Sequence, residues 1–288
     1  MLKTKFIWMH TLCSLFCGFI LHADTKTNID FCQEIKNRPK GSTIKVQLYS
    51  DIEGAQVEVK GPHNVYDPNT GQNLSRNFAS SKYFAIPTND GIKWGQEFPG
   101  VYQLVIVPDS KDGVVLVQGI EYPGMVFIYQ FEGKLGIVNE ASLEDFVASI
   151  LAHPDLEGIK DQEMLASLAI VMRTQALDWK ESSKNKFWTI KAPFCQYHGR
   201  SYVRFDEPFV NAIKTTKDMV LGINENQHMF LGTIPWFSQE KGFSYDKFQV
   251  FLDITKEKRD ARSILKEVFP KNQICLIKQL SVESSKSV

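Results

Sequence analysis

The stretch Leu143–Lys180, LEDFVASILAHPDLEGIKDQEMLASLAIVMRTQALDWK, predicts two helices joined by a short polar elbow. Ser142 and Asp145, three residues apart, predict a capping box at the start of the first helix. Pro154 disfavours helical geometry at His153, so this helix should end there. The apolar residues between these signals recur with the period of a helix: Leu143, Phe146, Val147, Ile150 and Leu151.

The second helix is predicted from about Gln162 to Glu181, with Asp161 as its N-cap. It is apolar over most of its circumference, which indicates burial on most sides. Arg173 lies within this apolar surface, where a guanidinium keeps its proton and needs a polar partner. Two interpretations follow. Arg173 either forms an internal ion pair that holds the fold, or faces a groove and binds substrate.

Strand signals dominate the residues before this stretch. Strands are predicted at 43–49, 55–60, 101–107 and 114–119, with a hairpin over 125–138. After the stretch, the sequence predicts helices at 208–216 and 257–269, and strands at 219–223, 228–231 and 273–280. We therefore expect an α+β fold. It should have a β-rich N-terminal half at 42–138, a helical core at 139–182 and a mixed α/β region at 183–280.

The two ends of the chain differ from this body. Residues 1–23 combine two lysines with an apolar run from Phe6 to Leu21, the pattern of a signal peptide or an N-terminal anchor. Export is therefore expected, to the periplasm or another extracytoplasmic compartment. Residues 24–41 are predicted to form a polar leader, and 281–288 a flexible tail.

Composition and cysteine spacing limit the classes of partner and ligand that we expect the chain to bind. The 33 basic and 33 acidic residues give no net charge, so no nucleic-acid partner is expected. A hydrophobic content of 43% indicates a folded body. Cys195 and His198 stand three residues apart, as metal ligands can, but no second such pair is nearby. We therefore predict no metal and no cofactor.

The central stretch also resembles the core of the stage II sporulation protein D / LytB amidase-enhancer family. The matching pieces occur in the family's order: Val138-Asn139, Leu143–Val147, Glu163–Ala166 and Arg173-Thr174. Farther along, Phe194–Gly199 is similar to the family's CQ-x-Y-x-G element, and Ser263–Pro270 to its closing EIL-x-x-YYP. The resemblance spans about residues 42–280, and the chain resembles a divergent member of the family. Leu168 replaces a family Gln, and of the family's glycine-containing elements the stretch 236–245 retains only Ser238 and Gly242.

The resemblance implies a peptidoglycan lytic transglycosylase. In that family one carboxylic acid, the Glu of a GEMP motif, protonates the glycosidic oxygen and then accepts the proton of the sugar's C6 hydroxyl. Alignment back from Arg173 places this acid on Asp155, and alignment forward from Leu143 places it on Pro154. Asp155 keeps the carboxyl but is one methylene shorter than Glu. Glu157, in the same elbow, is the alternative acid.

Three further residues are candidates for binding the sugar. Tyr197 and Trp236 are expected to stack on sugar rings, and Arg173 to bind substrate if it faces the groove. His153 is a candidate to orient the acid.

Two functions from different classes fit the sequence. One is an exported enzyme that cleaves glycan strands at cell division or wall remodelling. The other is a non-catalytic glycan-binding protein that enhances a peptidoglycan amidase. Both take peptidoglycan glycan strands as partner, and the second adds an amidase. The carboxyl retained at the aligned position favours the enzyme.

Overall fold

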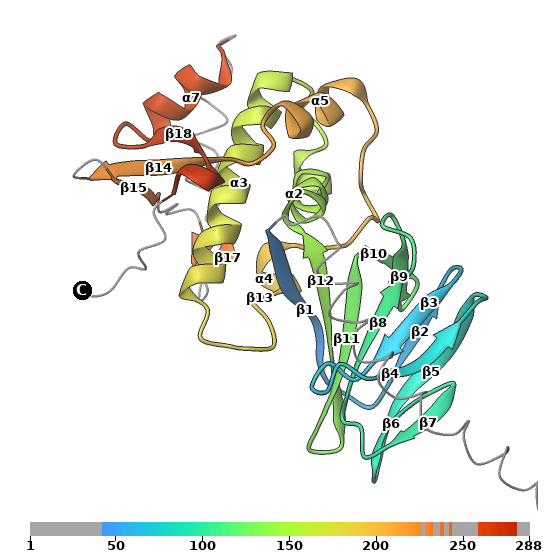
Figure 1. Ribbon diagram of the computed structural model, residues 1–288. Helices are drawn as coiled ribbons and strands as arrows, with labels where there is room; N and C mark the ends of the chain where they lie inside the picture. Colours follow the sequence, from blue (N-terminus) through green and yellow to red (C-terminus); the bar gives the residue numbers. More distant parts are fainter. Residues whose placement is uncertain (1–41, 226–227, 233–236, 239–241, 244–258, 281–288) are drawn as a thin grey trace, which may run out of the picture.

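The computed structural model describes residues 42–225, 228–232, 237–238, 242–243 and 259–280, and confirms the α+β class (Figure 1). Strands come first along the chain, and the helices and a smaller set of strands follow. The predictions for residues 1–23, 24–41 and 281–288 lie outside the described residues. Within the described residues, no helix is both long enough and apolar enough to span a membrane.

The larger hydrophobic core is formed by two antiparallel-rich sheets together with the helices packed beside them. The strands of the first sheet, in spatial order, are β13 (Ile190–Lys191), β1 (Thr43–Ile52), β12 (Lys134–Ser142), β11 (Met125–Phe131), β8 (Gln103–Pro108), β3 (His63–Tyr66) and β4 (Asn73–Asn77). Those of the second are β10 (Ile120–Pro123), β9 (Val114–Val117), β2 (Ala55–Val59), β5 (Ser81–Thr88), β6 (Gly91–Trp94) and β7 (Gln96–Pro99). Alternate residues of each sheet, such as Val57 and Ile128, point into this common core.

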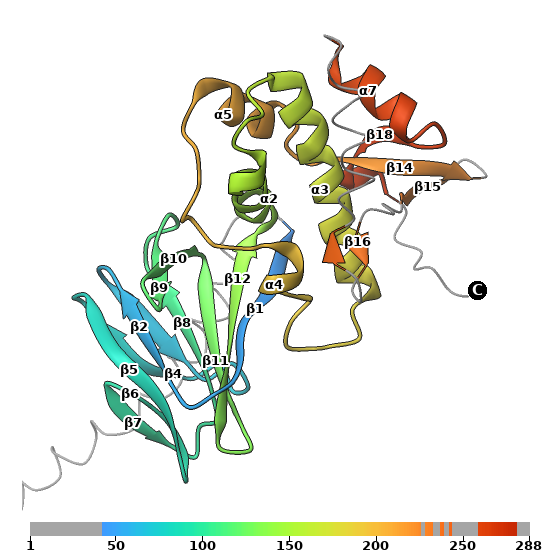
Figure 2. The same cartoon turned by 180° about the vertical axis from the view of Figure 1, so that it is seen from behind.

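The helices lie beside the β1 and β12 side of the first sheet (Figures 1 and 2). They are α2 (Leu143–Leu151), the 3₁₀ turn η1 (Pro154–Leu156), α3 (Gln162–Ser182), α4 (Ala192–Cys195), α5 (Glu207–Thr215) and α7 (Ala261–Val268). Against α3 packs a small sheet in the order β15 (His228–Leu231), β14 (Met219–Glu225), β18 (Gln273–Leu276), followed by the 3₁₀ turn η2 (Ile277–Gln279). A short pair, β16 (Phe237–Ser238) and β17 (Gly242–Phe243), completes the described elements.

The predicted helix starts are confirmed at the level of hydrogen bonds. The Ser142 hydroxyl accepts the Asp145 amide at 3.0 Å and caps α2. The Asp161 carboxylate accepts the Met164 amide at 2.9 Å and caps α3. The predicted hairpin is also present, as β11 paired with β12. Periodicity missed β3 and β4, because His63–Tyr66 is buried at every position and Leu74 is the single apolar residue of Asn73–Asn77, so neither strand alternates.

Arg173 forms the internal ion pair that was one of its two predicted roles. Its side chain is fully buried, and it binds Glu144 of α2 through two hydrogen bonds, from Nε at 2.9 Å and from Nη2 at 2.8 Å. A third bond runs from Nη1 to the Met219 carbonyl oxygen at 2.9 Å. The guanidinium therefore joins α2, α3 and β14, and every nitrogen has an acceptor inside the protein.

Replacement of this guanidinium should destabilise the protein strongly. Arg173→Met leaves the Glu144 carboxylate and the Met219 carbonyl without their donor. Loss of one partner of a buried pair costs about 3–5 kcal/mol. Because the Glu144 side chain is 26% exposed, we expect the lower end of this range. Urea unfolding measures the change.

The matched control is Arg262→Met, on the exposed face of α7, which should change the free energy of unfolding by no more than about 0.5 kcal/mol. Equal unfolding midpoints for the two variants would contradict the structural role of Arg173.

Candidate functional site

The elbow between α2 and α3 is a 3₁₀ turn that presents a carboxyl beside an imidazole. His153 precedes this turn, and its Nδ1 accepts the Asp155 amide at 3.3 Å. The Asp155 Oδ2 lies 3.4 Å from the same Nδ1. The Asp155 side chain is 58% exposed, whereas that of His153 is only 16% exposed. The elbow thus holds an accessible acid against a largely covered ring.

A second segment, residues 196–202, faces this elbow and contributes two more rings. The His198 ring stacks on His153, with centroids 5.8 Å apart and an interplanar angle of 29°. Tyr202 meets both imidazoles edge-on, at 5.7 Å from His198 and 6.4 Å from His153. We call His153, His198 and Tyr202 the ring cluster. Because Tyr202 is 46% exposed, the cluster has an accessible aromatic side.

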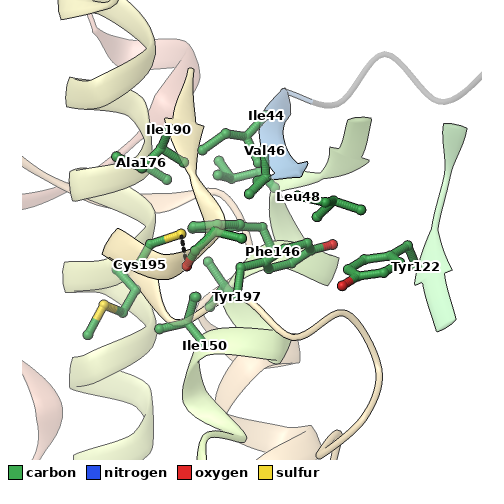
Figure 3. Close-up of a cluster of buried hydrophobic side chains, with 14 of the residues drawn as sticks. Ile44, Val46, Leu48, Tyr122, Phe146, Ile150, Ala176, Ile190, Cys195 and Tyr197 are labelled. Carbon is green, nitrogen blue, oxygen red and sulfur yellow. Dashed lines mark hydrogen bonds between the residues drawn. The ribbon is translucent and has the colours of Figure 1, made fainter. Parts of the chain in front are cut away.

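Segment 196–202 is anchored by a buried hydrogen-bond network. The Tyr197 hydroxyl donates to Asn139 Oδ1 at 2.6 Å. The Asn139 amide nitrogen donates to the carbonyl oxygens of Pro123 and Met125, at 2.8 and 3.0 Å. The Tyr197 ring also stacks on Phe146 of α2, with centroids 5.5 Å apart (Figure 3). Tyr197 therefore fixes the chain one residue before His198.

Close backbone packing fixes the residues just after His198. Gly199 has φ +56°, and a Cβ at this position would lie 2.2 Å from the Glu121 carbonyl oxygen, so only glycine fits. The next amide, of Arg200, donates to that same oxygen at 2.8 Å. The Arg200 side chain pairs with Asp145 of α2 at 3.6 Å. His198 is thus held between two anchored neighbours.

Burial makes His198 a weaker base. Partial desolvation lowers the pKa of His198 below its ordinary value, and the neighbouring His153 lowers it further by charge repulsion. The ring therefore stays neutral over a wider range below pH 7 than an exposed histidine does. A neutral imidazole has one nitrogen free to accept a proton.

The structure separates the residues predicted to bind substrate. Arg173 and Tyr197 are 0% and 2% exposed, so the prediction that they contact the sugar does not fit their positions. Both are held inside by hydrogen bonds to interior partners. Trp236 lies outside the described residues. Glu157 is exposed, and within the described part of the chain its carboxylate has neither a hydrogen bond nor an ion pair.

Cys195 is not arranged to act with His198. Its side chain is 2% exposed, and its Sγ lies 3.6 Å from the Lys191 carbonyl oxygen inside the fold. Burial raises the pKa of this thiol to about 12, so it remains protonated. Thiols ligate metals as thiolates.

Sequence reasoning missed the ring cluster as a unit. His153 and His198 are far apart in the chain, and Tyr202 lies in a segment without periodicity. The sequence signals were separate: His153 as a candidate to orient the acid, and the occurrence of His198 within the Phe194–Gly199 element. The structure also has a cavity of about 380 Å³ between α3, α5, α7 and β18, but neither the elbow nor segment 196–202 lines it.

Comparison with known proteins relates this chain to a family. A family model described as "SpoIID: Stage II sporulation protein" matches residues 131–222. An uncharacterized protein of Chlamydia muridarum (strain MoPn / Nigg) is 31% identical over 201 residues, which cover 68% of each chain. One of Chlamydia pneumoniae is 31% identical over 159 residues, 54% of this chain and 57% of the relative. One of Brachyspira hyodysenteriae (strain ATCC 49526 / WA1) is 28% identical over 134 residues, 46% of this chain and 35% of the relative. No solved structure matches.

The matched region runs from the end of β11 into β14 and includes α2, the elbow, α3 and segment 196–202. The chain belongs to the stage II sporulation protein D (SpoIID) family, as a divergent member. This family is associated with peptidoglycan, which supports a peptidoglycan-related role for the chain.

Removal of the Tyr197 hydroxyl should destabilise the protein and loosen segment 196–202. Tyr197→Phe leaves Asn139 Oδ1 buried without its donor, at a cost of about 1–3 kcal/mol. The control, Tyr122→Phe, removes a neighbouring buried tyrosine's hydroxyl that has no hydrogen bond within the described part of the chain. Thermal unfolding of the two variants should show the larger loss at Tyr197. A smaller loss of thermal stability in Tyr197→Phe than in Tyr122→Phe would rule out the Tyr197–Asn139 hydrogen bond as the anchor of segment 196–202.

Proposed function

We propose that the chain is an exported lytic transglycosylase that cleaves peptidoglycan glycan strands, with Asp155 as its acid. One observation carries this proposal: the elbow aligned with the family's catalytic acid presents an accessible carboxyl 3.4 Å from an imidazole nitrogen, beside exposed ring surface. Family membership supplies the peptidoglycan context.

The contact between His153 and Asp155 places the carboxyl at a defined position, with its Oδ2 3.4 Å from the imidazole Nδ1. His153 also holds the Asp155 backbone through the amide hydrogen bond. His153 is thus a positioning residue for the acid. A bound sugar chain would cover the exposed carboxyl and desolvate it.

The reaction then needs no water. The Asp155 carboxyl gives its proton to the glycosidic oxygen as the bond from that oxygen to C1 breaks. The C6 oxygen of the same sugar bonds to C1, and its hydroxyl proton passes to a base at the site. Tyr202 offers a half-exposed ring on which a sugar can stack. The products are a shortened strand and an anhydro-sugar end.

Substitution of the acid should remove the reaction and leave glycan binding. Asp155→Asn keeps the shape of the side chain and removes its proton, so anhydro-end formation should fall about 10²–10⁴-fold. Mass analysis of peptidoglycan strands incubated with the mature chain measures the ends, and co-sedimentation with those strands measures binding. Glu132→Gln, in the distant turn of the β11–β12 hairpin, is the control and should match the unsubstituted chain.

Glu157→Gln distinguishes the alternative acid. Loss of cleavage in this variant alone would show that Glu157, and not Asp155, is the catalytic acid. Full activity of Asp155→Asn would exclude Asp155 as the catalytic acid.

A non-catalytic enhancer of a peptidoglycan amidase is the second candidate. The observation that favours it is the 58% exposure of an aspartate one methylene shorter than the family's glutamate, because a catalytic acid works best when desolvated and within reach. Glycan binding without anhydro ends, together with faster hydrolysis by an added amidase, would select this function over the enzyme.

Export is the part of the proposal that residues 1–23 support. In cell fractionation, the full chain should be found in the extracytoplasmic or membrane fraction, and a chain lacking residues 1–23 should remain in the cytoplasm. Full-length protein recovered in the soluble cytoplasmic fraction would rule out export and any action on the cell wall.

A further inference from the structure

We propose that His198 is a second acid–base group of this site, which accepts the C6 hydroxyl proton while Asp155 donates one to the glycosidic oxygen. The inference rests on the proposed function and divides its proton transfers between two residues. Asp155, His153 and His198 form a continuous row from the elbow to segment 196–202, through contacts of 3.4 Å between Asp155 and His153 and a ring stack of 5.8 Å between the two histidines.

The short side chain of Asp155 gives a reason for a second acid–base group. A single acid must reach the leaving oxygen and then the C6 oxygen on the same sugar. Aspartate has one methylene fewer than glutamate, and the 3₁₀ turn with its His153 cap restrains the backbone of Asp155. Enzymes that cleave glycosidic bonds with two groups place them on either side of the bond, several ångströms apart. The ring of His153 contacts both Asp155 and His198, and so keeps these two groups apart.

The surroundings of His198 keep it a proton acceptor. The titratable groups that face it are His153 from the elbow and Tyr202 from its own segment. Asp155 lies beyond His153, and the charge of Arg200 is paired with Asp145 of α2. No carboxylate among the described residues therefore pairs with His198, and its lowered pKa, caused by burial and by His153, agrees with a neutral ring.

Its neighbours also hold His198 in place. Tyr197 is bonded to Asn139 on one side, and Gly199 packs against Glu121 on the other. A base must be held within hydrogen-bond reach of the proton that it accepts, and these anchors restrict the ring. The step is balanced. The C6 proton moves to His198, Asp155 loses one proton to the leaving oxygen, and solvent returns a proton from His198 to Asp155.

Two substitutions of His198 distinguish a role in proton transfer from a role in ring stacking. His198→Phe keeps a ring that can stack on His153 and removes the nitrogen, and His198→Gln removes both ring and titration. The probe is purified peptidoglycan glycan strands, and the readout is the rate of anhydro-end formation from pH 4 to 9. We expect a rate that falls on both sides of an optimum for the unsubstituted chain. Both variants should lose about 10²–10⁴-fold in rate and should lose the fall at low pH.

An NMR titration gives a readout that does not depend on cleavage. In the intact chain, the His198 imidazole should titrate below the ordinary value for histidine. His153→Gln removes the like charge beside it, so the His198 pKa should rise. A His198 imidazole that is still protonated at the pH of fastest cleavage could not accept the C6 proton and would overturn the proposal.

The remaining outcomes are distinguishable. If His198→Phe cleaves at the unsubstituted rate with its optimum intact, His198 only packs against its neighbours, and the enzyme function stands without it. If the variants raise KM and leave kcat and the pH profile unchanged, His198 binds sugar and transfers no proton. If the unsubstituted chain forms no anhydro ends, both the proposed enzyme and this inference fail together. Equal melting temperatures for the variants exclude misfolding as the cause of a loss.

Discussion

The buried amide of Asn139 is the interaction on which the site depends. Its nitrogen binds two backbone carbonyls where β10 meets β11, and its oxygen accepts the Tyr197 hydroxyl from a segment far along the chain. All of these groups are removed from water, so each hydrogen bond must form or leave a costly unpaired atom. A single side chain on β12 thereby fixes the position of segment 196–202 against the sheet.

Arg173 gives the helical side of the molecule a similar constraint. Its guanidinium binds the Glu144 carboxylate with two donors and the Met219 carbonyl with a third. Because this fork has one favourable geometry, α2, α3 and β14 are held in a fixed relation. Asn139 orients the sheet side of the site and Arg173 the helix side, so the elbow and segment 196–202 meet where His153 stacks on His198.

The contact between these two anchored parts determines the chemistry that the site can perform. Desolvation and the neighbouring imidazole favour neutral His198, and the Nδ1 of His153 holds the turn that carries Asp155. The result is a solvated carboxyl beside a row of rings in a chain of the SpoIID family. This arrangement differs from a single glutamate in a cleft, and it is the reason that we divide the proposed proton transfers between two residues.

The sequence alone determined the local structure and the family. Caps at Ser142 and Asp161, the break at Pro154 and the helical period are properties of neighbouring residues, so they could be predicted without knowledge of the fold. Strands β3 and β4 could not, because β3 is buried at every position and β4 has a single apolar residue, so neither shows the alternation of a half-buried strand. The burial of Arg173 and Tyr197 and the meeting of His153 with His198 and Tyr202 were decided only by the tertiary structure. Their partners are distant in the chain, and sequence periodicity contains no information about which distant segments pack together.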